Sequence, residues 1–411
     1  MKNFLNIDKD VMPVGGYIAP TPRMLDGDFN TVTDKVYKDM KSCGLNFIDS
    51  LSISYDSHKS YFIKQLKLAE KYGIKLLVGE KNNVYDDSYN AKKLIDGVSR
   101  YKDYPAFAGI HGCDEPCGER IRQARDRKRD FDAAFKNKEF YVNLLPNYAK
   151  DEMLADENYS GGDKYDYYIN NCINTIQPDY ISFDYYPFVS ESPYILPGYF
   201  KNLGAIAKIS QKKGIPFLSC MQATSWNEAY ARYVTLGEMN WQVKTNLLFG
   251  CRGIIYFTYA VPICDLPENE TFRQAIIDKQ GKRTERFYYA KKNNDHIKSI
   301  QHILMNSDLK GIIRVGDTPD ELPEDMLIAD YKEYLSLTGK HILIGCFDYK
   351  NDTVLYILNN SITEKDKFTL KLNKICDADI YYDTKKTSKA GKTFTKGLDA
   401  GNACLIHIKS K

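Results

Sequence analysis

Two adjacent carboxylates end an apolar run in the stretch FAGIHGCDEP, residues 107–116. Asp114 and Glu115 follow the apolar residues directly, and Pro116 ends the run. Such a pair can divide acid and base roles, because each negative charge disfavours ionisation of the other. The pair can instead cap a helix that begins near Pro116, since proline and acidic groups both suit a first helical turn. The choice depends on whether other strands end in polar groups at the same level.

Eight short runs rich in β-branched and aromatic residues recur through the first three quarters of the chain, and a helical segment follows each of them. The runs cover residues 13–20, 46–52, 75–80, 107–116, 140–147, 180–188, 216–223 and 253–260. The spacing of about 30–40 residues is what a strand, a helix and two loops require, and it predicts a (β/α)₈ TIM barrel over residues 1–305. A doubly wound open sheet is the alternative, but it normally begins with a glycine-rich phosphate-binding turn, and GGYIAPTP is not one.

Several of the intervening segments carry helix end signals. The predicted helices 31–44 and 61–73 each end on glycine, which suits the left-handed residue after a helix. The predicted helix 235–250 opens with Thr235 and Glu238 at capping-box spacing.

After residue 305 the alternation of strand and helix patterns gives way to strand patterns alone. Residues 341–361 form two alternating runs around a turn that contains Asn351 and Asp352. Alternating runs separated by turn residues continue to the C-terminus. This pattern predicts a small antiparallel β-sandwich over residues 306–411.

Polar side chains stand at nearly every predicted strand end, which is where barrels of this kind place their chemistry. We expect substrate contacts from these strand ends and the loop after the seventh strand, namely Tyr17, Asp49, Glu80, Asp114, Asn143, Tyr186, Gln222, Trp226 and Tyr256, beside the carboxylates Glu115 and Asp184. The acidic doublet therefore belongs to a ring of hydrogen-bonding groups.

The residue types in this ring exclude several reactions. Only His58 and His111 fall in the first half of the barrel, without the spacing of a metal site, so we predict no metal. Glycine-rich phosphate turns are missing after strands seven and eight, and no lysine stands late in a strand for Schiff-base chemistry. Carboxylates, amides and tyrosines remain, and these can protonate a glycosidic oxygen and bind several hydroxyl groups.

The barrel resembles the clan A glycoside hydrolases, in which strand 4 ends in Asn-Glu-Pro and the glutamate is the acid/base. Here CDEP occupies that position, and the resemblance covers roughly residues 10–300. It implies that Glu115 is the acid/base and that Asp114 replaces the asparagine. A small C-terminal sandwich is a common companion of such barrels.

The sequence departs from that family at strand 7, which ends in CMQA rather than in a nucleophilic glutamate. The amide of Gln222 cannot form a covalent glycosyl-enzyme. Asp184 is our expected second carboxylate, as base or nucleophile. Strands 4 and 6 are two apart at about 4.8 Å per strand, which leaves room for the roughly 6.5–9.5 Å carboxyl separation that admits a water and inversion.

Two other functions stay open. Substrate-assisted hydrolysis of an N-acetylhexosaminide would use Glu115 as acid and Asp114 to steer the acetamido group, as the similarity of an adjacent Asp-Glu to the β-hexosaminidases implies. The other is a non-catalytic glycan-binding barrel.

Several of these residues also have structural interpretations. Gln222 can be a buried, satisfied amide, and Asp49 and Glu80 can pair with nearby lysines. Trp226 lies in a loop and suits stacking on a sugar ring, whereas Trp241 lies within a predicted helix and suits the core.

Composition adds few constraints on partners. The net charge is +3, and the charge-dense run 119–130 mixes both signs, which favours a solvated helix face over a polyanion site. We therefore expect an oligosaccharide or polysaccharide substrate, with no nucleic acid and no membrane insertion, and no cofactor. No secretion signal opens the given sequence, so we expect a cytoplasmic protein, or a secreted or cell-surface one if a leader was removed.

The ten cysteines are scattered, and several lie inside apolar runs, as reduced, buried cysteines do. Cys113 and Cys117 flank the acidic doublet but have no second Cys or His pair nearby in the sequence, so we predict no zinc site there.

Overall fold

The computed structural model describes residues 3–22, 30–51, 53–79, 89–189, 195–226, 231–262, 272–273 and 275–410. Its first part is a closed barrel of eight parallel strands in chain order. The strands are β1 (Val14–Gly16), β2 (Phe47–Ser50), β3 (Lys75–Val78), β4 (Phe107–Asp114), β5 (Glu139–Leu144), β6 (Ile181–Tyr185), β7 (Phe217–Gln222) and β9 (Gly253–Phe257). All eight predicted runs are strands, so the barrel is confirmed and the open sheet is wrong.

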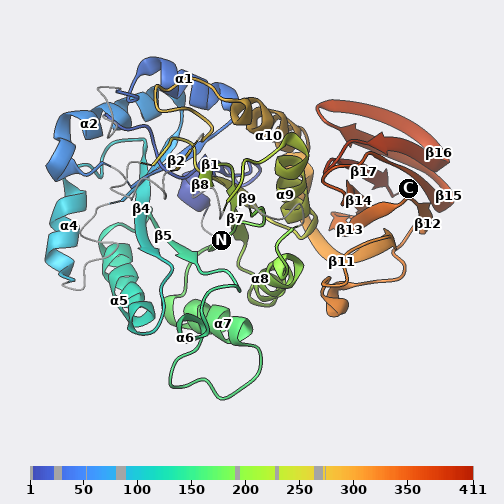
Figure 1. Cartoon of the computed structure of the whole chain (residues 1–411), viewed down its shortest axis with the longest axis horizontal. Helices are drawn as coiled ribbons and strands as arrows, with labels where there is room; N and C mark the ends of the chain where they lie inside the picture. The colour runs from blue at the N-terminus through green and yellow to red at the C-terminus, as the bar shows by residue number, and fades with distance from the viewer. Residues whose placement is uncertain are drawn as a thin grey trace.

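Helices return the chain between successive strands on the outside of the barrel (Figure 1). They are α1 (Asp34–Cys43), α2 (Tyr55–Tyr72), α4 (Ala91–Ser99), α5 (Glu119–Ala134), α6 (Asp151–Leu154), α7 (Lys164–Ile176), α8 (Tyr199–Lys213), α9 (Leu236–Leu248) and α10 (Glu285–Leu304). Two further short strands, β8 (Ser225–Trp226) and β10 (Phe272–Arg273), pair with each other.

The predicted helix ends have the expected chemistry. Gly44 and Gly73 follow α1 and α2 in the left-handed conformation, with φ of 93° and 62°. Thr235 and Glu238 form both hydrogen bonds of the capping box at the start of α9.

The amino-terminal end of the barrel interior is filled by apolar side chains. The short 3₁₀ helix η1 (Phe4–Asn6) supplies Phe4 and Leu5 to a cluster with Phe47, Leu77 and other inward residues. Gly15 makes room for this packing, since a Cβ there would come within 2.3 Å of the Phe47 ring. Polar side chains are left to the opposite, carboxyl end of the strands.

The C-terminal part is antiparallel, as predicted. Its strands are β11 (Ser307–Gly316), β12 (Tyr334–Thr338), β13 (His341–Tyr349), β14 (Asp352–Asn359), β15 (Asp366–Tyr382), β16 (Lys385–Leu398) and β17 (Ala403–Lys409), with a 3₁₀ turn, η3 (Glu324–Met326), after β11. Hydrogen bonds join them into one sheet in the order β11-β13-β14-β17-β15-β12, with β16 on β15. The long β15 pairs with β12 near its start and with β17 near its end, so the sheet folds over its own apolar core.

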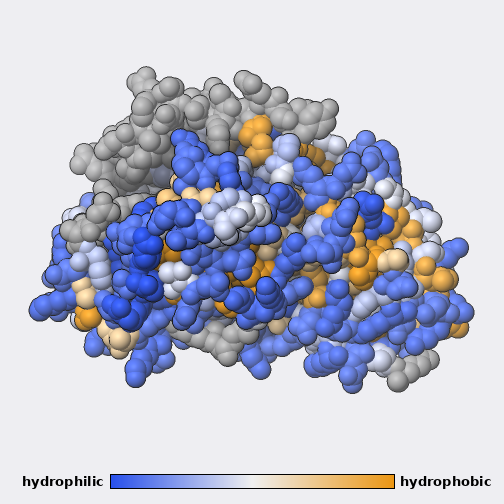
Figure 2. Space-filling model, turned by 90° about the horizontal axis from the view of Figure 1, so that it is seen from below, coloured by the Kyte–Doolittle hydropathy of each residue, from blue (hydrophilic) through white to orange (hydrophobic). Residues whose placement is uncertain are grey.

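Helices α9 and α10 lie between the barrel and this sheet (Figure 1). Trp241 of α9 is fully buried, as predicted, and its indole Nε1 donates to Asn360 Oδ1 across the contact at 2.9 Å. Hydrophilic residues cover most of the face shown in Figure 2, with hydrophobic residues between them. None of the helices in the described residues has the length and apolar character needed to cross a bilayer.

The nine cysteines within the described ranges form no disulfide, and eight of them are buried. Most of the charged run on α5 is paired along the helix, as between Arg122 and Glu119 or Arg129 and Asp126. Arg127 and Lys128 of the same run are buried, so the run is only partly solvated.

Candidate active site

Three neighbouring strands bring the predicted carboxylates together at the carboxyl end of the barrel. Asp114 at the end of β4 pairs in register with Asn143 of β5, which pairs with Ser182 of β6. The Asn143 amide then donates to Asp184 Oδ1 at 2.7 Å. Asn143 thus connects residues that are about 70 positions apart in the chain, Asp114 through the strand pairing and Asp184 through its side chain.

Asn143 is itself fixed by a layer of hydroxyl groups beneath it. The Ser182 hydroxyl donates to Asn143 Oδ1 at 3.2 Å and lies 2.8 Å from the Tyr141 hydroxyl. An amide whose oxygen accepts from a hydroxyl has its nitrogen directed to the carboxylate, so the orientation of Asp184 is set by its neighbours.

Glu115 has an unusual backbone conformation for a residue with a side chain. Its φ is 47°, in the left-handed region that non-glycine residues seldom adopt. Its N–H donates to Asn143 O at 2.9 Å, and Arg120 of α5 donates to the carbonyl oxygens of Asp114 (2.9 Å) and Glu115 (3.5 Å). Strained backbone held by its surroundings is frequent at functional sites.

Burial and like charges raise the pKa values of both candidate catalytic carboxyls. Burial, then the charge of Asp114, raises the pKa of Glu115 to about 7, and Arg120 opposes this shift. Burial, then the charges of Glu115 and Asp114, raises the pKa of Asp184 well above its usual value, opposed by the Asn143 hydrogen bond. The charge of Glu115 therefore acts on Asp184, and Glu115 keeps its proton to a higher pH than an isolated carboxyl does.

Four aromatic rings gather at the same end of the barrel. Tyr186, Trp226 and Phe257 contact one another with ring centroids 5.0–5.4 Å apart, and Tyr17 lies 5.4 Å from Phe257. The Tyr17 hydroxyl also donates to Asp114 Oδ2 at 3.4 Å. The structure thus places the predicted Tyr17, Tyr186 and Trp226 in one aromatic group beside the acidic pair.

Asp49 is paired with a histidine, a partner that the sequence did not suggest. Its Oδ2 is 2.6 Å from His111 Nδ1, and both residues are buried. The predicted pairing of Asp49 with a lysine is therefore wrong.

Gln222 is occupied by the backbone of two loops, which corrects the prediction of a substrate contact. Its Nε2 donates to Phe188 O and Arg232 O, both at 3.0 Å, and its Oε1 accepts from Phe188 N–H at 3.1 Å. Both donors and the oxygen are used inside the protein, and the residue is fully buried. The satisfied structural amide is the interpretation that the structure favours.

Tyr256 points out of the barrel, so the prediction that it contacts substrate is also wrong. Its hydroxyl donates to Asn294 Oδ1 of α10 at 2.7 Å, and its ring is fully buried. Side chains alternate along a strand, so the inward residue of β9 is Phe257 instead. Glu80 falls outside the described residues.

Sequence reasoning missed Arg120, His111 and Phe257. His111 stands three positions before Asp114, and strict alternation would place them on opposite faces of β4. A register shift between His111 and Cys113 brings both to the inside. Phe257 could have been found by alternation from Tyr256, and Arg120 by its place in the first turn after the doublet.

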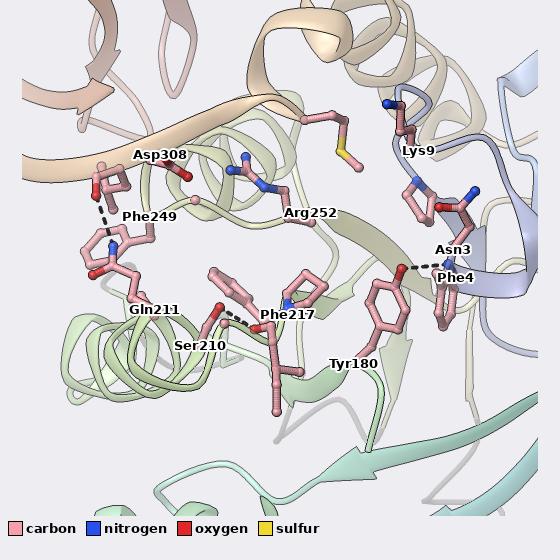
Figure 3. Close-up of a pocket in the computed structure, with 18 of the residues that line it drawn as sticks. Asn3, Phe4, Lys9, Tyr180, Ser210, Gln211, Phe217, Phe249, Arg252 and Asp308 are labelled. Atoms are coloured by element: carbon pink, nitrogen blue, oxygen red, sulfur yellow. Dashed lines mark hydrogen bonds between the residues drawn. The ribbon is translucent and has the colours of Figure 1, made fainter. Parts of the chain in front are cut away.

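A separate hollow of about 750 Å³ lies at the other end of the barrel (Figure 3). Residues at the starts of the strands line it, including Tyr180, whose hydroxyl accepts from Phe4 N–H at 2.6 Å, and Arg252. None of the predicted site residues lines it, and barrels place their chemistry at the opposite end. We therefore locate the candidate site by its converging polar groups rather than by the size of a hollow.

Within the described ranges no three His, Cys, Asp or Glu side chains are arranged to hold a metal ion. The site as described consists of carboxyls, an amide, aromatic rings and one buried histidine.

Comparison with known proteins identifies no family for this chain. No protein-family model matches the sequence, and no curated protein matches it. The similarity found is to solved structures, at low sequence identity.

Three of these solved structures match almost the whole chain. A glycoside hydrolase family 5 protein from Bacteroides vulgatus has a TM-score of 0.57 at 12% identity, over 98% of this chain and 89% of that one. An α-amylase from Anoxybacillus has a TM-score of 0.56 at 10% identity, over 98% of both chains. A family 39 glycoside hydrolase from Bacteroides cellulosilyticus has a TM-score of 0.52 at 11% identity, over 98% of this chain and 82% of that one. At these low identities, the structural similarity shows that the proteins share a fold.

Proposed function

We propose that this protein hydrolyses an O-glycosidic bond, with Glu115 as general acid and Asp184 as the second carboxylate. The observation that carries the proposal is the pair itself, two carboxyls at the ends of β4 and β6 whose pKa values are both raised by burial and by the charge of Asp114, with Glu115 raising that of Asp184 further. The aromatic group beside them offers surfaces for sugar rings. The solved structures named above, which are described as glycoside hydrolases and an amylase, support a glycosidase activity in general.

The geometry suggests how the reaction would proceed. Protonated Glu115 gives its proton to the glycosidic oxygen while the bond from that oxygen to the anomeric carbon breaks. Ionised Asp184, held by Asn143, takes a proton from the attacking water, whose oxygen bonds to the anomeric carbon. The cycle closes when Asp184 releases a proton to solvent and Glu115 regains one.

Substrate-assisted hydrolysis is the second candidate, and one observation favours it. Burial raises the pKa of Asp184 well above its usual value, which favours the protonated carboxyl over the ionised form that a base requires. Asp114 lies beside Glu115 and accepts a hydrogen bond from Tyr17, so it could orient a 2-acetamido group instead. The two schemes differ in whether a 2-acetamido group is required.

A glycan-library hydrolysis screen tests the proposal. The wild-type protein is expected to release sugar from at least one glycan, and E115Q to lose turnover by about 10²–10⁴-fold, the usual contribution of general acid catalysis. Glu119 of α5 is exposed and pairs with Arg122, so E119Q is the matched control and should keep full activity.

The screen also separates the three functions. Hydrolysis confined to 2-acetamido substrates, with D184N active, would select the substrate-assisted scheme. Binding without hydrolysis would select the glycan-binding barrel. Full turnover by E115Q would reject Glu115 as the acid in either scheme.

A further inference from the structure

A buried ion-pair candidate lies directly beneath the acidic doublet. His111 of β4 is fully buried, Asp49 of β2 is 1% exposed, and His111 Nδ1 lies 2.6 Å from Asp49 Oδ2. Neither residue has a part in the proposed reaction as written above.

The other ring nitrogen of His111 faces the doublet. His111 Nε2 is buried without a hydrogen-bond partner and lies 3.9 Å from Asp114 Oδ1. The Tyr17 hydroxyl approaches Asp114 Oδ2 at the long distance of 3.4 Å. Asp114 thus lies between the Tyr17 hydroxyl and a buried ring nitrogen that has no hydrogen-bond partner.

The titratable groups around His111 come from several strands. Asp49 of β2 and Asp114 of β4 face its two nitrogens, and the Tyr141 ring of β5 and the Tyr17 ring after β1 meet it edge-on, with centroids 5.0 Å and 5.8 Å away. Burial lowers the pKa of His111, but the charges of Asp49 and Asp114 outweigh this and raise it. The ionised Asp49 beside a neutral ring would be an uncompensated buried charge, which is costly. Burial accordingly raises the pKa of Asp49, and the charge and hydrogen bond of His111 oppose that shift.

We propose that Asp49 and His111 are a positioning pair that decides which carboxyl of the doublet holds the proton. The inference rests on the proposed function above. A doubly protonated His111, held by Asp49, presents its second N–H to the Asp114 carboxylate. The single proton of the doublet then resides on Glu115, where the glycosidic oxygen can take it.

The pH dependence of kcat/KM tests this role. Without the imidazolium, Asp114 competes for the proton, so in H111Q the acid limb of the profile should move to higher pH by about one unit, the size of shift that loss of a nearby opposite charge produces. D49N should move it in the same direction, because His111 then loses its own stabilising charge. A merely structural role would lower activity equally at every pH.

Y180F is the matched control for these variants. It removes a tyrosine hydroxyl at the opposite end of the barrel, where it accepts from Phe4 N–H, without changing any charge. Its profile should keep the wild-type shape. An unmoved acid limb in both H111Q and D49N would overturn the positioning role.

Histidine ¹⁵N NMR tests the charged pair without using enzyme activity. The wild-type spectrum at pH 7.5 should contain one doubly protonated imidazole that is missing from H111Q, and in D49N that signal should become neutral at this pH. A neutral His111 in wild type at pH 6 would overturn the pair. If H111Q does not fold, the comparison of wild type with D49N still shows whether His111 and Asp49 form a charged pair. If NMR shows the imidazolium but no glycan is cleaved, the proposed function fails and the pair stands.

Discussion

At the residue scale, the chemistry of the site depends on which carboxyl keeps a proton near neutral pH. Burial and the neighbouring charge of Asp114 raise the pKa of Glu115 to about 7. A catalytic acid must be protonated to act, so the activity of the wild-type protein should fall as the pH rises through about 7.

Asp114→Asn tests the electrostatic part of this shift. Removing the negative charge makes ionisation of Glu115 easier, so the alkaline limb of kcat/KM should move to lower pH by up to about one unit. Profiles of D114N and of the control E119Q, measured on the same glycan, check this. An alkaline limb that stays in place in D114N would show that the charge of Asp114 does not reach Glu115.

Sequence reasoning could anticipate the acidic doublet, Asn143 and Asp184 because each ends a strand, and strand ends meet at one rim. It could not anticipate the internal hydrogen bonds of Gln222, since those partners lie in loops whose path only the folded chain defines. It also misplaced Tyr256, because the inward residue is set by the register of the barrel.

At the element scale, helix α5 holds the end of β4 in its strained conformation. Arg120 in the first turn of α5 donates to the carbonyls of Asp114 and Glu115, and so fixes the backbone that presents the acid.

The eight strands and the helix ends could be predicted from the sequence, because periodicity and capping residues indicate them. The register shift in β4 did not, because nothing in the local sequence distinguishes it from regular alternation.

Arg120→Met tests this contact. The variant loses hydrogen bonds to two carbonyls, which should lower the free energy of unfolding by about 1–3 kcal/mol. It also loses a cation that lowers the pKa of Glu115, so the alkaline limb should move to higher pH. Urea unfolding and pH profiles measure the two effects.

R120K separates charge from geometry. It keeps the positive charge and should restore much of the pH profile without restoring stability. A wild-type alkaline limb in R120M would contradict the electrostatic part of the account.

At the scale of the whole molecule, a buried polar network joins the barrel helices to the C-terminal sheet. Lys244 of α9 is fully buried and donates to Asn293 of α10. His296 of α10 lies 3.0 Å from Asp383 O and 3.1 Å from the Tyr356 hydroxyl of β14. The change from alternating strands and helices to strands alone predicted a barrel and a C-terminal β domain. How the two dock could not be predicted, because the residues that hydrogen-bond across their contact are distant in the chain.

Lys244 should make the stability of the protein depend on pH. Burial lowers its pKa to about 7 in the folded state, against about 10.4 when exposed. Below pH 7 the folded protein carries the full cost of a buried charge, and this cost is lost as the pH rises from about 7 to about 10.4. The difference in unfolding free energy between K244M and wild type should therefore shift in favour of wild type across this window.

Urea unfolding at pH 6, 8 and 9.5 measures that difference. The exposed Lys67 of α2 provides the control variant K67M, for which the difference from wild type should stay constant with pH. If the difference in unfolding free energy between K244M and wild type is also constant with pH, burial does not lower the pKa of Lys244 in the folded protein.

The most direct test of the central claim compares leaving groups. The kcat/KM of E115Q is measured on the glycan found in the screen and on an aryl glycoside of the same sugar, whose phenolate leaves without needing a proton. We predict a loss of about 10²–10⁴-fold on the glycan and of less than about tenfold on the aryl glycoside. Equal losses on the two substrates, or no loss on the glycan, would contradict the role of Glu115 as the acid.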